Sequence, residues 1–284
     1  MTAMPPATLL DVLPARHRPE PTCEPAIIVS HARLSPAIFR LVLHAPHITA
    51  SAQAGQFVML SVPEVAGRVI QLPRPMAIHR RHRDAGDIEV IYNVQGPGTD
   101  ALSRAREGGT LLVTGPLGRG FDIPGTATSL LLIGRGIGIC SFMTLVEDAA
   151  GAAIASTAVL SARTGDRVIG RSDCDQLGAK AIPVTDSDGS SSVEAVDRTL
   201  TGEFAGRPPG LIVVCGSQRL TELAMDLSAR WQVPLQVSLE AHMACGLGYC
   251  HGCAIPYTGD SFREGPLVCH DGPVFAVRST HAAV

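Results

Sequence analysis

The chain has 284 residues, a formal net charge of −3 and a hydrophobic content of 45%. This length suits two modest domains with a smaller appendage. The slight acidity excludes a basic surface for nucleic acid, the 4% aromatic content argues against a base-stacking surface, and no apolar run is long enough to span a membrane. We therefore expect a cytoplasmic protein without nucleic-acid or membrane partners.

Residues 1–25 are rich in proline, interrupted by charges, and lack the continuous apolar stretch of a signal peptide. We expect this segment to be a flexible or partner-bound extension. Residues 26–124 then show short strand patterns with a single helical segment. In the clearest strand, Ile88, Val90 and Tyr92 alternate with other residues and so share one face. Short strands at this spacing predict an antiparallel β-barrel.

Residues 125–240 show a different pattern, in which apolar strands alternate with helices. Strands are predicted near residues 129–133, 158–160, 182–184 and 211–214, and helical stripes follow the first and the last of them. This alternation is typical of a doubly wound α/β domain, which we expect to bind a nucleotide. Residues 241–284 are rich in cysteine and glycine and are expected to form a small, loop-like metal domain.

Four of the eight cysteines follow one another in the spacing Cys245-x4-Cys250-x2-Cys253-x15-Cys269. Glycines between the first three let the backbone fold around one centre. The spacing matches the plant-type [2Fe–2S] arrangement. A structural zinc site is the alternative, but zinc ribbons usually have two short Cys-x2–4-Cys knuckles, and here the return segment carries a single cysteine.

A flavin site is indicated by three pieces of the first domain. Arg74-Pro75-Met76-Ala77 follows a predicted strand, Tyr92 lies on a later one, and Gly98-Thr99 opens a short helix. An arginine can pair with a pyrophosphate, and a helix N-terminus with a glycine and a hydroxyl can hold a phosphate. For the Arg-Pro pair alone, a surface turn is the alternative.

A nucleotide site is indicated at the carboxyl edge of the second domain. Gly134, Gly136 and Gly138 lie between a buried strand and a helix, where a doubly wound sheet binds a dinucleotide phosphate. The spacing lacks the full Rossmann fingerprint, so a tight strand-to-helix turn is the alternative. Cys215 and Gly216 follow the last parallel strand, where they either line a nicotinamide pocket or begin a helix.

Taken in order, these motifs resemble the electron-transfer subunit family of class 1B dihydroorotate dehydrogenase, which is similar to ferredoxin–NADP reductases with an added [2Fe–2S] domain. The resemblance covers about residues 26–275 and is most specific at 243–253 and 268–275. It implies a catalytic partner subunit with its own flavin. It implies cluster ligands at Cys245, Cys250, Cys253 and Cys269, and FAD contacts at Arg74, Pro75, Met76, Ala77, Ile91, Tyr92, Asn93, Gly98 and Thr99.

Three residues depart from the family pattern: Ala77 replaces a serine or threonine, Asn93 replaces an arginine, and Arg135 replaces a glycine of the nucleotide loop. The last departure bears most on NAD(P) binding. These departures are compatible with a paralogue that serves a different dehydrogenase.

We expect a redox subunit that passes electrons between NAD(P)(H), FAD and a [2Fe–2S] cluster, to or from a catalytic dehydrogenase subunit in a hetero-oligomer. Dihydroorotate dehydrogenase, in pyrimidine biosynthesis, is the first candidate. No side chain is expected to be catalytic, because the cofactors carry the chemistry. The alternatives are a self-sufficient NAD(P)H reductase for a soluble acceptor, a subunit of another dehydrogenase with a degenerate nicotinamide site, and a non-redox scaffold with a structural metal.

Overall fold

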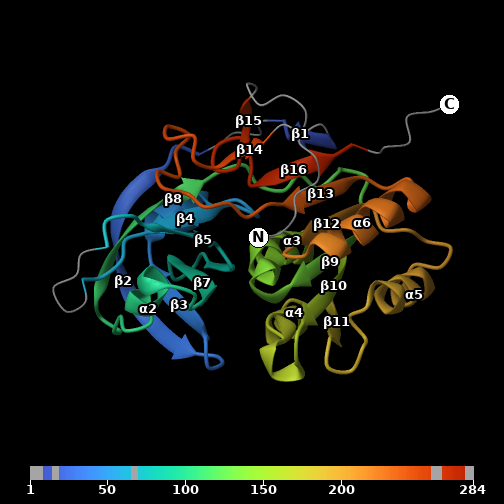
Figure 1. Cartoon of the computed structure of the whole chain (residues 1–284), viewed down its shortest axis with the longest axis horizontal. Helices are drawn as coiled ribbons and strands as arrows, with labels where there is room; N and C mark the ends of the chain where they lie inside the picture. Colours follow the sequence, from blue (N-terminus) through green and yellow to red (C-terminus); the bar gives the residue numbers. More distant parts are fainter. Residues whose placement is uncertain (1–8, 15–18, 65–69, 257–263, 279–284) are drawn as a thin grey trace.

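The computed structural model describes residues 9–14, 19–64, 70–256 and 264–278. These residues form two seven-stranded sheets and one two-stranded sheet. In Figure 1 the first seven-stranded sheet lies on the left, the second lies on the right with its helices, and the two-stranded sheet lies at the top. Among the described residues, no helix combines the length and apolarity needed to cross a membrane.

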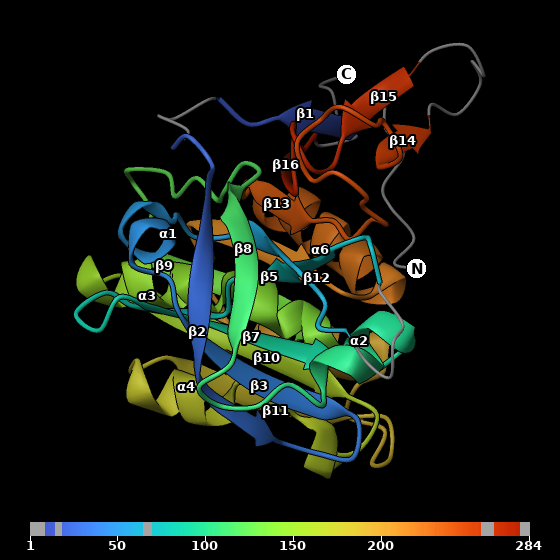
Figure 2. The ribbon, with the colours of Figure 1, turned by 90° about the vertical axis from the view of Figure 1, so that its left-hand side faces the viewer.

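The first sheet is antiparallel, has the order β5-β4-β8-β2-β3-β7-β6, and curls around its own core (Figure 2). The predicted alternation is confirmed, because Ile88, Val90 and Tyr92 all belong to that core. Its elements are β2 (Thr22–Arg33), β3 (Ile38–His44), α1 (Pro46–Ser51), β4 (Phe57–Leu60), β5 (Arg74–Ala77), β6 (Arg80–His82), β7 (Asp87–Asn93), α2 (Pro97–Leu102) and β8 (Thr110–Leu117).

The second sheet has the order β1-β16-β13-β12-β9-β10-β11. Successive residues of β9 enter apolar cores on opposite faces: Leu131 and Ile133 on one, Leu130 and Leu132 on the other. Burial on both faces explains the unbroken apolar run and confirms the doubly wound arrangement. Its parallel part contains β9 (Ser129–Arg135), a 3-10 segment (Gly136–Phe142), α3 (Met143–Gly151), β10 (Ala155–Ala162), a second 3-10 segment (Gly165–Arg167), α4 (Arg171–Gln176), β11 (Lys180–Thr185), α5 (Val193–Glu203), β12 (Leu211–Cys215), α6 (Gln218–Trp231) and β13 (Leu235–Ser238).

The structure corrects the expectation of a flexible extension over residues 1–25. The strand β1 (Leu10–Val12) pairs antiparallel with β16 (Val274–Val277), and β2 begins at Thr22, where it pairs with β8. Leu10 is buried in the core of the second sheet, and this burial stabilises the short strand. Residues 1–8 and 15–18 of the expected extension lie outside the described residues.

The C-terminal region is also more regular than the loop-like domain that we expected. The strands β14 (Ala254–Pro256) and β15 (Glu264–Leu267) form the two-stranded sheet. β16 joins the second seven-stranded sheet beside β13, which puts the residues after the last cysteine in contact with the nucleotide-binding-like part. Long-range pairing of such short strands has no local sequence signal. Residues 257–263 and 279–284 of this region lie outside the described residues.

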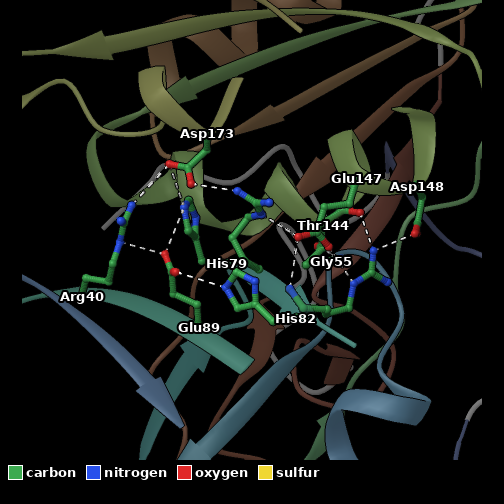
Figure 3. A network of polar contacts seen from close by, with 11 residues as sticks. Arg40, Gly55, His79, His82, Glu89, Thr144, Glu147, Asp148 and Asp173 are labelled. Carbon is green, nitrogen blue, oxygen red and sulfur yellow. Dashed lines mark hydrogen bonds and ion pairs between the residues drawn. The ribbon is translucent and has the colours of Figure 1, made fainter. Parts of the chain in front are cut away.

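A buried polar network connects the curled sheet to the α/β part of the chain (Figure 3). Arg80 Nε donates to Glu147 Oε1 at 2.6 Å, and its Nη1 donates to Asp173 Oδ1 at 3.0 Å. Arg81, whose side chain is 2% exposed, donates from Nε to Glu147 Oε2 at 3.1 Å and from Nη2 to Asp148 Oδ1 at 2.6 Å. A buried charge without its partner is costly. The network therefore fixes how the two parts face one another, and with it the cavity between them.

Candidate redox site

A cavity of about 280 Å³ lies where the curled sheet, the α/β part and the chain leading to the cysteine cluster meet. It brings together ten residues that the sequence indicates as cofactor contacts: Arg74, Pro75, Met76, Ala77, Ile91, Tyr92, Asn93, Thr99, Gly138 and Cys215. The remaining four, Gly98, Gly134, Gly136 and Gly216, are not in its lining. Gly98, Gly134 and Gly216 pack closely against their neighbours, as described below, whereas Gly136 is open.

The start of α2 lies directly on the side chain of Arg74. A Cβ added to Gly98 would stand 2.3 Å from both Nε and Nη2 of Arg74, so a glycine is required for this contact. Arg74 Nη1 donates to the Leu72 carbonyl at 2.9 Å, which holds the guanidinium at the edge of the cavity. The Thr99 hydroxyl accepts the backbone N–H of Gln95 at 2.9 Å and so fixes the turn that leads into α2. The arrangement places one cation with free donors at the cavity wall.

Tyr92 forms a rigid part of the wall. Its ring stacks on Phe39 with centroids 5.7 Å apart, and its hydroxyl lies 2.9 Å from Nε2 of His31. Burial raises the pKa of Tyr92, so the phenol stays protonated. The side chain is held in place by the protein itself and is not a proton donor for chemistry near neutral pH.

The glycine loop packs tightly against its own domain at two of its three glycines. A Cβ on Gly134 would lie 2.6 Å from the Phe142 ring, and one on Gly138 would lie 2.8 Å from Gly216 Cα. These contacts are those of a tight strand-to-helix turn. Gly136 differs, because its φ is +55° and no atom lies within 4 Å of its Cβ position. The outer side of the loop is therefore open at Gly136.

Cys140 and Cys215 both border the cavity and are buried. Burial raises the pKa of the Cys140 thiol well above its usual range and that of Cys215 to about 12. Both side chains therefore remain thiols, and they supply small apolar walls, without reactive sulfur. Cys174 is buried and Cys23 is exposed, and neither lies in this cavity lining.

Backbone N–H groups point at the sulfurs of the cysteine cluster. Cys245 Sγ accepts N–H groups from Leu247 at 3.4 Å and Cys250 at 3.5 Å, and Cys253 Sγ accepts the N–H of Cys269 at 3.4 Å. Although burial raises the pKa of Cys245, these donors outweigh it and lower the pKa to about 6. Burial and the adjacent Cys253 raise the pKa of Cys269 to about 12. The N–H donors at Cys245 therefore stabilise its thiolate, the form that binds metal.

Backbone contacts join the four cysteines into two pairs: the N–H of Cys250 donates to Cys245 Sγ, and the N–H of Cys269 donates to Cys253 Sγ. In the described parts of the chain, the group of three or more histidine, cysteine or carboxylate ligand atoms within 4.8 Å of one another is His79, Glu89 and Asp173. No three of the four cysteine sulfurs are therefore that close to one another. A single tetrahedral zinc would hold all four about 3.8 Å apart, given a Zn–S distance of about 2.3 Å. Two separate pairs fit a centre with two iron atoms better.

The cavity also has lining residues that sequence reasoning missed. They include Phe57 of the curled sheet and Glu240, Ala241, Met243 and Pro273 beside the cysteine cluster. Their only signal is position: Met243 precedes the first cysteine of the cluster by two residues, and Pro273 follows the last by four. The cavity therefore extends to the chain that carries the cluster.

Comparison with known proteins agrees with this architecture. A sequence family described as the iron–sulfur cluster binding domain of dihydroorotate dehydrogenase B matches residues 240–280. The solved structure of an NADH-dependent reduced ferredoxin–NADP oxidoreductase, studied for flavin-based electron bifurcation, has a TM-score of 0.73 at 25% identity and covers 88% of this chain and 87% of its own. A ferredoxin NADP+ reductase from Neisseria gonorrhoeae shares the fold, with a TM-score of 0.57 at 16% identity over 72% of this chain and 89% of its own. The fold and the four-cysteine site define a ferredoxin-reductase-like oxidoreductase subunit with an added iron–sulfur region.

Curated relatives identify the family more narrowly. A protein of Streptococcus pneumoniae is 31% identical over 87% of this chain and 94% of its own length, and one of Streptococcus thermophilus is 30% identical over 89% and 96%. A third, from Desulforamulus reducens, is 28% identical over 85% and 92%. All three are named dihydroorotate dehydrogenase B (NAD(+)), electron transfer subunit. The chain belongs to this family of electron-transfer subunits, which work with a catalytic subunit. The expected cofactors FAD, [2Fe–2S] and NAD(P) agree with that membership.

Proposed function

We propose that the chain is an NAD(P)-linked subunit that moves electrons between a nicotinamide, FAD, a [2Fe–2S] cluster and a catalytic dehydrogenase. Residues 26–124 would hold FAD, residues 125–240 the nicotinamide nucleotide, and residues 241–284 the cluster. Dihydroorotate dehydrogenase, as in the names of the relatives, is the first candidate for the partner. Eight cysteines without a disulfide suit the reducing cytoplasm, where pyrimidine synthesis would place the complex.

One observation carries this proposal: a single cavity is lined by all three of these regions. Arg74 and Thr99 come from the curled sheet, Gly138 and Cys215 from the carboxyl edge of the parallel sheet, and Met243 from the approach to the cysteines. A group in this cavity would contact a nucleotide on one side and the cluster region on the other. That is the geometry that an electron relay needs.

The residues present fit the three groups. When bound, FAD and [2Fe–2S] supply the exchange between two-electron and one-electron transfer. Arg74 would pair with a flavin phosphate, and the apolar side chains of Met76, Ile91 and Phe57 would exclude water from the ring. Cys245, Cys250, Cys253 and Cys269 would hold the cluster, with the N–H groups of Leu247, Cys250 and Cys269 stabilising their sulfurs.

Purification of the native complex tests this proposal. We expect the chain to co-purify with a catalytic dehydrogenase subunit and to contain FAD, iron and acid-labile sulfide in the ratio of one FAD and two iron atoms per chain. NADH or NADPH should bleach the flavin anaerobically without the partner, whereas reduction of the acceptor of the complex should require it. A protein that contains zinc and no labile sulfide, or that reduces the acceptor without a partner, would contradict the proposal.

A further inference from the structure

Three buried side chains converge where the curled sheet meets α4 (Figure 3). His79 lies between β5 and β6, Glu89 lies in β7, and Asp173 lies in α4. Each offers one ligand atom, and these atoms lie within 4.8 Å of one another. His79 Nε2 is 3.4 Å from Asp173 Oδ2 and 3.8 Å from Glu89 Oε1. His79 is 0% exposed and the two acids are also buried, so the group is enclosed by protein.

The atoms that face one another in this group have no hydrogen bond that would compensate for their burial. Within the described residues, Nε2 of His79, Oε1 of Glu89 and Oδ2 of Asp173 are buried without a hydrogen-bond partner. The other carboxylate oxygens have contacts outside the group: Asp173 Oδ1 accepts from Arg80 Nη1 at 3.0 Å, and Glu89 Oε2 lies 3.5 Å from His82 Nε2. Buried polar atoms normally have partners. A nitrogen and two oxygens aimed at one another therefore indicate a shared ligand.

The charges around the group favour a cation as that ligand. The network consists of three arginines and four carboxylates: Arg40, Arg80, Arg81, Glu89, Glu147, Asp148 and Asp173. With neutral histidines, it carries one more negative charge than positive charges. Buried charge without compensation is costly. A cation between His79 and the two acids offsets the excess.

The spacing of the three atoms matches that of metal ligands. Two of their separations are 3.4 Å and 3.8 Å and the third is at most 4.8 Å, so a point equidistant from them lies about 2.0–2.4 Å from each. Zinc–nitrogen and zinc–oxygen bonds in proteins are about 2.0–2.2 Å long. One imidazole and two carboxylates suit divalent ions of the first transition row.

Arg40 competes for the same oxygens. Its Nε lies 2.9 Å from Glu89 Oε1 but makes no hydrogen bond among the described residues, and its Nη2 lies 3.5 Å from Asp173 Oδ2. The side chain is 30% exposed and borders a second cavity, of about 400 Å³, together with Ile91 and Arg171. The guanidinium therefore has room to turn into that cavity, and the same opening gives an ion a route to the buried group.

We propose that His79, Glu89 and Asp173 bind a divalent ion of the first transition row, and that Arg40 neutralises the two carboxylates until the ion displaces it. The ion joins the curled sheet, through His79 and Glu89, to the α/β part, through Asp173. This metal site is separate from the cysteine cluster, and its role is to hold the two parts of the molecule together around the redox cavity.

Titration of the oxidised, cofactor-loaded subunit with Mn²⁺ tests the site. The paramagnetic resonance signal of free Mn²⁺ disappears on binding, and the oxidised cluster gives no signal of its own. Metal analysis of the same sample measures any divalent ion already present. In the wild type, bound Mn²⁺ and that ion, with the cluster iron excluded, should sum to one per chain. His79→Ala should bind Mn²⁺ at least about tenfold more weakly, because losing a residue that merely supports a metal ligand already costs about 10- to 100-fold.

His82→Ala is the matched control, because it removes the other histidine beside Glu89, which is 41% exposed and lies outside the group. It should change the affinity for Mn²⁺ less than about twofold. Arg40→Met keeps the aliphatic stem and removes the competing charge. It should tighten Mn²⁺ binding roughly two- to fivefold, which is the equivalent of releasing a partly exposed ion pair.

Equal Mn²⁺ binding in wild type and His79→Ala would overturn the proposal, because the ion would then lie elsewhere. A wild type that holds no such ion would overturn it as well, because the group would then hold only a proton on His79. Weaker binding in Arg40→Met would show that Arg40 does not compete with the ion, and this variant decides the question if His79→Ala does not fold. FAD, iron and labile sulfide are measured on the same samples, so a failure of the proposed function is seen separately.

Discussion

The contact between Gly98 and Arg74 allows the proposed flavin site to be tested without altering the arginine itself. In Gly98→Ala, the added Cβ would stand 2.3 Å from Nε and Nη2 of Arg74, so the guanidinium must move. Gly96→Ala is the matched control on the same turn, because no heavy atom lies within 4 Å of its Cβ position and its backbone is extended. The two substitutions add the same methyl group two residues apart.

The expected size of the effect follows from what Arg74 would contribute. Each charge-assisted hydrogen bond to a phosphate stabilises the bound state by about 1.5–3 kcal/mol. Displacing the guanidinium should therefore weaken FAD retention by roughly 10- to 150-fold. Arg74→Ala should show a similar loss, and the double variant should lose little more than either single one, because both changes remove the same interaction.

FAD affinity is measured by titrating apoprotein, prepared by mild flavin removal, with FAD and following protein fluorescence or flavin absorbance. We expect wild-type FAD affinity for Gly96→Ala and strong, non-additive losses of affinity for the other variants. Full retention of FAD in Gly98→Ala, or additive losses in the double variant, would refute the role of Arg74 at the flavin phosphate.

Three further predictions concern the rest of the molecule. Glu147→Gln should lower the free energy of unfolding, measured by denaturant titration, by about 2–3 kcal/mol, because the new amide would face the buried guanidinium of Arg81. The control Asp148→Asn changes the other partner of Arg81, whose side chain is 46% exposed, and should lower it by less than about 1 kcal/mol. Cys253→Ser should abolish the visible iron–sulfur absorption and the bound iron while flavin remains, and retention of both iron atoms would contradict the ligand assignment. Burial raises the pKa of Asp173, but the adjacent His79, whose Nε2 lies 3.4 Å from Asp173 Oδ2, and the nearby arginines lower it more. The stability from this carboxylate is therefore complete above its unfolded pKa of about 3.9 and is lost as the pH falls below that value. Asp173→Asn should flatten this part of the pH–stability curve.

Local patterns predicted the regular elements well, because the signal for these elements is contained in a few adjacent residues. The alternation in β7 and the apolar run of β9 each indicated the correct sheet. The cysteine spacing predicted a metal centre, and in the structure backbone N–H contacts join Cys245 to Cys250 and Cys253 to Cys269. The pairing of β1 with β16 joins the two ends of the chain and has no local signal, so the N-terminal segment was wrongly expected to be flexible throughout.

The arrangement of the candidate site depends on contacts between distant residues. Arg135 donates a hydrogen bond to Asp186, which lies 51 positions further along the chain, and this contact has no local sequence signal. Glu240 and Met243 reach the cavity because they closely follow β13, whose last residue, Ser238, also lines it. The spacing of residues along the chain predicts which residue types act together. How closely these residues lie in space depends on how the sheets pack.

Low-temperature electron paramagnetic resonance of the isolated subunit after anaerobic reduction with NADH tests whether electrons pass from the nicotinamide through the flavin to the cluster. We expect bleaching of the flavin absorbance and the signal of a reduced [2Fe–2S] cluster, with at most one unpaired electron per chain on the cluster. The cluster signal should be lost in Cys253→Ser. A flavin that NADH reduces with no cluster signal, in a protein shown to contain two iron atoms and labile sulfide per chain, would contradict electron relay from the cavity to the cysteine cluster.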